Sequence, residues 1–221
     1  GWVNDLGYDY SGENGERDGI RRGTISLSGD YFVTDDLQLG FTLRSSEETS
    51  DFDSTDGSAS LPGGYVVDNP LPYAERQEFA GEVFANLSTM DGLIEHRLSY
   101  QLTSNDEARN GGAFTTTETS EIAYRMSWAL DGTSVENAEQ LLNVMVEAER
   151  DSSSADAANE RGSISYALEY RGSFDNGVNL QAGLRYDDNN QFEDILVWNV
   201  AGSYEFARGV RLHASAGTGA V

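Results

Sequence analysis

A chain of 221 residues is long enough for one large domain or two ordinary ones. Its 38 acidic residues against 14 basic ones give a formal charge of -24, which repels nucleic acid and therefore argues against a nucleic-acid partner. The chain has no cysteine, so thiolate catalysis, thiolate zinc sites and disulfides are excluded. Its longest apolar runs, such as residues 195–198, are far shorter than the ~20 residues that a transmembrane helix needs.

Alternation of apolar and polar residues with a period of two dominates the sequence, in segments of roughly ten residues separated by turn residues. In residues 37–44, for example, every odd position is Leu or Phe, and every even position is polar or glycine. This pattern predicts antiparallel strands. In chain order they are residues 24–32, 37–44, 79–87, 94–102, 122–130, 142–148, 164–171, 178–186, 196–206 and 210–216.

The connections between these segments alternate in length. Short turns are expected at 33–36, 88–92, 131–137, 175–177 and 207–209, and longer polar loops at 46–74, 103–116, 150–160 and 187–193. Short turns at one rim and long loops at the other are typical of a transmembrane barrel, whose rims face the periplasm and the outside. All three prolines, Pro62, Pro70 and Pro72, fall in the longest loop, where they interrupt no strand.

An antiparallel sandwich would show the same alternation, so aromatic residues near the strand ends are informative. Beside the short turns lie Tyr31, Phe32, Trp128, Tyr170, Tyr204 and Phe206, and near the opposite rim lie Tyr100 and Tyr186. Two such levels are typical of the aromatic girdles of a membrane barrel. The sequence therefore predicts an all-β fold, an antiparallel transmembrane β-barrel segment of about ten strands with short periplasmic turns and long extracellular loops.

We expect residues 1–221 to be one partial barrel domain. The chain begins with Gly1 and has no leader segment, so any signal peptide lies outside it. Ten strands of a larger barrel would leave two open edges, whose unpaired backbone groups lipid cannot satisfy.

Two segments carry motifs of a known family. The first runs through Glu13-Asn14-Gly15-Glu16-Arg17-Asp18-Gly19-Ile20 to the turn Val33-Thr34-Asp35-Asp36 and on to Asp53. The second contains Leu184-Arg185-Tyr186-Asp187-Asp188-Asn189-Asn190-Gln191-Phe192, Glu205-Phe206, Gly209-Val210-Arg211 and Ala214-Ser215-Ala216-Gly217-Thr218-Gly219. Together they resemble the barrel of TonB-dependent outer-membrane receptors, most closely the cobalamin receptor branch.

The resemblance implies active import across the outer membrane of a Gram-negative bacterium. The implied ligand is cobalamin or a ferric siderophore, and the implied energy source is TonB, acting through an N-terminal plug domain. The family has 22 barrel strands, so the plug and the remaining strands are expected outside this chain.

The resemblance also implies calcium in acidic extracellular loops of the cobalamin branch. By position, Glu16 and Asp18 match one acidic pair, and Asp51 and Asp53 match the cluster after the following hairpin. Hard oxygen ligands from two loops could together supply the six to eight oxygens that calcium takes. The alternative is ordinary solvation of acidic loops.

Ligand contacts are expected from loop aromatics, which could stack on the flat face of a corrin or a siderophore. These are Tyr8, Tyr10, Tyr65, Tyr73 and Phe114. Along the lumen we expect ladders of ion pairs that build the wall or dock the plug. They would join Arg44, Arg97, Arg125, Arg171, Arg185 and Arg211 to Glu82, Glu95, Glu147, Glu169 and Glu205.

An enzyme is not expected. The only histidines are His96, predicted on the lipid face close to a short turn, and His213, predicted near the periplasmic end of its strand. No nucleophile elbow, phosphate-binding loop or metalloprotease motif occurs. The alternatives to active uptake are a passive porin-like channel and a surface adhesin or soluble β-sandwich.

Overall fold

The computed structural model describes residues 2–8, 18–55, 66–67, 72–156, 158, 160–206 and 209–219. In this part of the chain eleven antiparallel strands form one sheet in the order β1-β2-β3-β6-β7-β8-β9-β10-β11-β12-β13. The strands are β1 (Trp2–Tyr8), β2 (Asp18–Phe32), β3 (Leu37–Asp51), β6 (Tyr73–Thr89), β7 (Ile94–Arg109), β8 (Thr115–Ala129), β9 (Gln140–Ser153), β10 (Arg161–Ser173), β11 (Val178–Asn189), β12 (Ile195–Phe206) and β13 (Val210–Gly217). A two-stranded hairpin, β4 (Ser54–Thr55) and β5 (Val66–Val67), lies apart from it.

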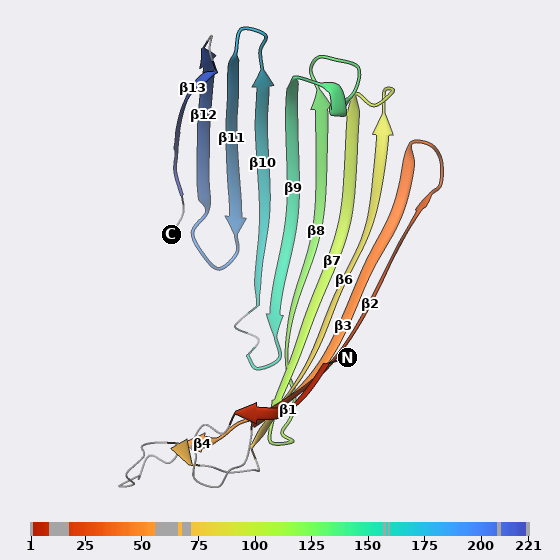
Figure 1. Cartoon of the computed structure of the whole chain (residues 1–221), viewed down its shortest axis with the longest axis vertical. Helices are drawn as coiled ribbons and strands as arrows, with labels where there is room; N and C mark the ends of the chain where they lie inside the picture. Colours follow the sequence, from red (N-terminus) through yellow and green to blue (C-terminus); the bar gives the residue numbers. More distant parts are fainter. Residues whose placement is uncertain are drawn as a thin grey trace.

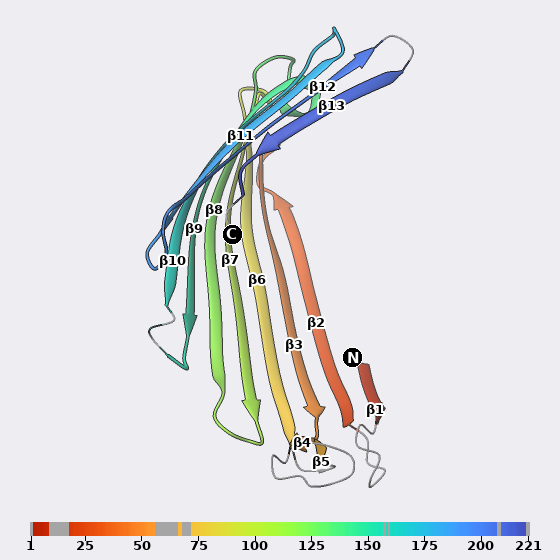
Figure 2. The ribbon, with the colours of Figure 1, turned by 90° about the vertical axis from the view of Figure 1, so that its left-hand side faces the viewer.

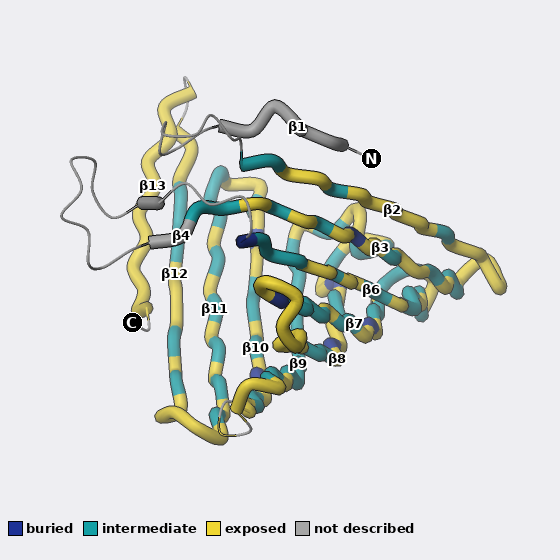
Figure 3. The backbone as a smooth tube through the Cα atoms, turned by 90° about the horizontal axis from the view of Figure 1, so that it is seen from below, coloured by how far each residue is buried: buried dark blue, intermediate teal, exposed yellow. Residues whose placement is uncertain are grey.

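The large sheet is an up-and-down meander, because each long strand pairs with the next long strand along the chain (Figure 1). The side view shows the strands leaning and curving together (Figure 2). Seen from below, the sheet bends into an open trough with β1 and β13 at its edges (Figure 3). All ten predicted strands are present, which confirms the predicted fold class, and β1 is an eleventh strand that the sequence pattern did not predict.

One face of the trough is apolar across its full width. The register aligns apolar residues on consecutive strands, as in the row Leu98, Tyr124, Val146, Tyr166, Tyr186 and Leu196. All of these side chains except the half-buried Val146 are exposed, and the only buried hydrophobic residues among those described are three alanines, Ala108, Ala123 and Ala129. A sandwich would bury its apolar face against a second sheet, so this face is a surface that meets lipid.

The strands run further than the sequence predicted at the end opposite the short turns. The expected loop at 103–116 is wrong, because β7 continues to Arg109 and β8 begins at Thr115, leaving a five-residue connection, 110–114. The expected loop at 46–74 also loses its first residues to β3, which ends at Asp51, and its last to β6, which begins at Tyr73. In these extensions both faces of the sheet are polar, so alternation disappears while the backbone ladder continues.

The short-turn rim is tightly built. Between β6 and β7 the chain reverses through Met90 and Asp91, both at positive φ, and Gly92 at φ 89°. The predicted turn at 131–137 contains a 3₁₀ helix, η1 (Val135–Asn137), and the Val135 amide donates to the Gly92 carbonyl at 2.8 Å. No helix in the described part of the chain is both long and apolar enough to cross a membrane.

Candidate functional site

The polar face of the trough is the candidate functional surface, because it is the face that would line a pore. Two concavities of about 780 and 520 Å³ open on it near the short-turn rim. Their lining comes mainly from the even-numbered residues of β3 and β6 and the odd-numbered residues of β7 to β13, which share this face in the register. Since the concavities lie on the side carrying the polar residues, the polar face is the concave one. The apolar face is accordingly the convex one.

An ion-pair cluster occupies the middle of this wall. Glu147, whose side chain is 15% exposed, lies 3.5 Å from Arg185 and 3.7 Å from Arg125. Arg185 also pairs with Asp187 at 2.7 Å and donates to the Ser165 hydroxyl at 2.9 Å. Because these residues come from β8, β9, β10 and β11, the cluster ties four strands together through side chains as well as backbone.

A second cluster surrounds an aromatic ring on the same wall. The Arg97 guanidinium lies 4.2 Å from the centre of the Phe84 ring and also pairs with Glu82 and donates to Asn86. The ring lies over Gly40, where a Cβ atom would come within 2.3 Å of it. A residue larger than glycine at position 40 would therefore displace the ring.

Towards the long-loop rim, Arg22 connects the polar extensions of three strands. It pairs with Glu78 at 2.9 Å and with Glu48 at 3.5 Å, and Ser46 donates to the same Glu78 carboxylate at 2.8 Å. This network is not predicted from the sequence, because residues 46–74 are expected there to form a loop. The alternation Ser46, Glu48, Ser50 against Glu47, Thr49, Asp51 carries no apolar signal that could have revealed the strand.

The predicted ladder of arginine and glutamate pairs is confirmed in part. The pairs that connect strands join Arg97 to Glu82 and both Arg125 and Arg185 to Glu147, whereas Arg171 pairs with Glu169 on its own strand, β10. Four of the named residues take no part in an ion pair within the described ranges, namely Arg44, Arg211, Glu95 and Glu205.

Three of the four carboxylates predicted to bind calcium lie in the described residues, all at the long-loop rim. Asp18 begins β2, Asp51 ends β3, and Asp53 follows it by two residues, while Glu16 lies outside the described residues. Since Ile20 pairs with Ser50, the start of β2 and the end of β3 lie side by side. Among the residues described, no three His, Cys, Asp or Glu side chains are grouped to hold a metal ion. The described donors thus form at most part of such a site.

Three of the five predicted ligand-binding aromatics lie in the described residues, at the same rim. Phe114, 42% exposed, lies in the turn between β7 and β8. Tyr73 begins β6 on the convex side of the sheet, the same side as Phe79, and its hydroxyl lies against Gly111 of that turn. The backbone of Tyr8 pairs with Asp18. Nothing is described for Tyr10 and Tyr65, which lie outside the described residues.

The two histidines occupy opposite faces. His96 pairs in register with Leu87 and Met126 on the apolar face, and its ring nitrogens lie 2.8 Å from the Tyr124 hydroxyl and 3.1 Å from the Thr89 hydroxyl. These contacts satisfy both ring nitrogens of His96 and explain how an imidazole is tolerated on the lipid face. His213 lies opposite Ser203 on the polar face.

Comparison with known proteins identifies the kind of barrel from which this sheet comes. The family model described as TonB dependent receptor-like, beta-barrel, matches residues 1–220. Comparison with curated proteins finds no match. Among solved structures, the siderophore receptor PirA from Pseudomonas aeruginosa is similar at a TM-score of 0.70 and 16% identity, over 89% of this chain and 33% of that one.

A second similar structure is the RagAB peptide importer in its closed-closed state, at a TM-score of 0.65 and 11% identity, over 90% of this chain and 33% of that one. At 16% and 11% identity, these similarities establish a shared fold and nothing about the ligand. The chain spans about a third of the length of each of these two structures.

Proposed function

The chain belongs to the TonB-dependent receptor β-barrel family, and we propose that it forms part of a receptor that actively imports a scarce ligand. Members of this family are outer-membrane barrels of Gram-negative bacteria and transporters rather than enzymes, so the predicted location and the absence of an enzyme activity are confirmed. Energy would come from TonB, acting through a plug domain and further strands outside residues 1–221.

The observation that carries this proposal is the division of one sheet into two unlike faces. The convex face presents a continuous exposed apolar belt, and the concave face carries ion-pair clusters such as that around Glu147. A lipid-facing belt with a polar lining is what a transport barrel requires. The soluble sandwich is excluded by the same observation, because no second sheet covers the apolar face of the described residues.

Two ligand classes remain in the proposal. Cobalamin is favoured by the sequence resemblance in residues 13–53 and 184–221, and a ferric siderophore is favoured by the similarity to a siderophore receptor. The aromatic residues at the long-loop rim, Tyr73 and Phe114 among them, are the proposed ligand contacts. Calcium is proposed to order that rim through Glu16, Asp18, Asp51 and Asp53, whose oxygens are the hard donors it prefers.

Binding to the full-length receptor in detergent tests the ligand. Cyanocobalamin and a ferric siderophore would each be titrated by tryptophan quenching, with calcium and with chelator. Tight cyanocobalamin binding that weakens on chelation, and that weakens likewise in the variant Asp51→Asn with Asp53→Asn, is the expected result. The matched control is Asp35→Asn at the opposite rim, which should leave binding unchanged. Binding of the siderophore alone would contradict the cobalamin proposal.

Uptake by cells tests active transport against the porin alternative. Cells that express the receptor should accumulate labelled ligand only when TonB is present. Equal uptake with and without TonB would contradict the active mechanism and favour a passive channel.

A further inference from the structure

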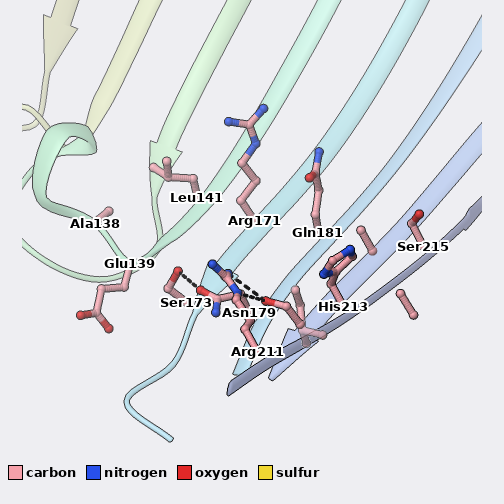
Figure 4. A pocket seen from close by; sticks show the side chains of 16 residues that line it. Ala138, Glu139, Leu141, Arg171, Ser173, Asn179, Gln181, Arg211, His213 and Ser215 are labelled. Atoms are coloured by element: carbon pink, nitrogen blue, oxygen red, sulfur yellow. Dashed lines mark hydrogen bonds between the residues drawn. The ribbon is translucent and has the colours of Figure 1, made fainter. Parts of the chain in front are cut away.

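The larger concavity on the polar face is lined by two rows of residues that run straight across β10 to β13. One row is His213, Ser203, Asn179 and Ser173, each directly opposite the next in the register. The row beside it is Ser215, Ala201, Gln181 and Arg171. Figure 4 shows these side chains gathered over the wall, with Arg211 reaching across from β13. The lining thus comes mainly from the sheet itself, with Ala138 and Glu139 added from the connection before β9.

Arg211 is the distinctive group of this concavity. It lies opposite Glu205 in the register, but its Nε and Nη2 atoms donate instead to the Ser203 hydroxyl, at 3.1 and 2.9 Å. Arg171 is different, because Glu169 pairs with it. Among the described residues no carboxylate pairs with Arg211, although the chain carries 38 acidic residues.

Two nearby carboxylates, those of Glu169 and Glu139, are committed elsewhere or turned away. Glu169 accepts from both Arg171 and Gln181. The Glu139 side chain, at the edge of the concavity, points away from Arg211 in Figure 4. The remaining donors of the Arg211 guanidinium and the His213 imidazole therefore border a concavity of about 780 Å³, and no described carboxylate pairs with Arg211 there.

We propose that Arg211 and His213 form a carboxylate-binding subsite on the lumen wall near the short-turn rim. A guanidinium fork matches the two oxygens of a carboxylate, and such charge-assisted bonds are about twice as strong as neutral ones. Ser203 accepts from the Nε and Nη2 atoms of Arg211, which leaves the Nη1 end of the guanidinium for a carboxylate, and His213 lies two residues further along β13 on the same face. This inference rests on the proposed transport function, which places the wall along the path of a ligand.

The carboxylate has two possible sources. It belongs either to a free ligand that passes along the wall or to a side chain of the same protein outside residues 1–221. The chemistry of the subsite is the same in both cases, and the two arms of one experiment distinguish them.

The first arm titrates citrate into the purified full-length receptor by calorimetry. A subsite for a free ligand predicts that citrate binds, that Arg211→Gln weakens binding about tenfold or more, and that His213→Gln weakens it less. The matched control is Arg44→Gln, which removes another lumen-facing guanidinium that has no ion pair within the described ranges and should leave citrate binding unchanged.

The second arm measures thermal unfolding of the same variants without citrate. A subsite filled by the protein's own carboxylate predicts that Arg211→Gln lowers the unfolding midpoint by a few degrees and that Arg44→Gln does not. The proposal is overturned if Arg211→Gln changes neither readout, or if Arg44→Gln changes them equally. Neither arm uses cobalamin, a siderophore or TonB, so failure of the subsite is distinguishable from failure of the proposed transport function.

Discussion

Replacing Gly40 with valine should destabilise the barrel through one specific collision. A Cβ atom at position 40 would lie 2.3, 2.7 and 2.9 Å from the Cζ, Cε1 and Cε2 atoms of Phe84. All three distances are below 3.0 Å, so the ring must move off the wall. Its movement also breaks the contact with the Arg97 guanidinium, which now lies 4.2 Å from the ring centre.

The expected cost follows from these two effects. Forcing extra carbon atoms into a packed position costs about 1–3 kcal/mol, and loss of a partly exposed cation–π contact costs about 0.5–1 kcal/mol. Valine is otherwise the better strand former, because it favours extended backbone more than glycine does. In a Phe84→Ala background the collision is gone, so Gly40→Val should there be neutral or slightly stabilising.

The test is whether the effect of Gly40→Val on the free energy of unfolding changes sign when the Phe84 ring is removed. The four receptors, namely wild type, the two single variants and the double variant, would be folded into phospholipid vesicles and unfolded with guanidinium while tryptophan fluorescence is recorded. The coupling free energy between positions 40 and 84 should be about 1–3 kcal/mol, the upper range for residues in direct contact. If Gly40→Val costs the same with and without the Phe84 ring, the contact does not explain the glycine and the reasoning is refuted.

Two further predictions concern the two faces of the wall. Leu98→Arg, on the apolar face, should lower the free energy of unfolding in vesicles by about 2–4 kcal/mol. The control Gln101→Arg, on the lumen face of the same strand, should change this free energy little. Similar losses at both positions would argue against the assignment of the faces. Glu147→Gln should cost about 1–3 kcal/mol because it leaves two guanidinium groups without their shared partner, and Glu95→Gln, which breaks no ion pair among the described residues, is the control expected to be near zero in the same assay.

The membrane-spanning strands could be predicted because lipid imposes a strict rule on alternate residues. Every second side chain from Leu37 to Leu43 is apolar, and the register continues this face through Val83 to Leu98 on the next strands. His96 breaks the rule, and its contacts with Tyr124 and Thr89 show why it could be accommodated near the turn. Where lipid covers one whole face of the sheet, a period of two in the sequence is sufficient to predict the strands.

Outside the lipid the same reasoning loses its signal. Residues 46–51 of β3 and 103–109 of β7 form a regular ladder with water on both sides, so neither face selects apolar residues. Such a strand is held by backbone hydrogen bonds and by partners distant in sequence, such as Glu78 for Arg22. A single sequence shows neither the backbone hydrogen bonds nor the distant partners, so these extensions are predicted as loops.

For the charged lining, the sequence predicts which face each arginine lies on but not which residue it pairs with. Alternation placed Arg97, Arg125 and Arg211 on the lumen face, but it could not choose their partners. In the register Arg97 lies directly opposite Arg125, and each turns to a carboxylate on its other neighbouring strand, Glu82 or Glu147. Arg211 faces Glu205 across the ladder and yet bonds to Ser203. The pairing on a wall of this kind depends on side-chain direction within the sheet, and it leaves cations such as Arg211 without a carboxylate partner among the described residues.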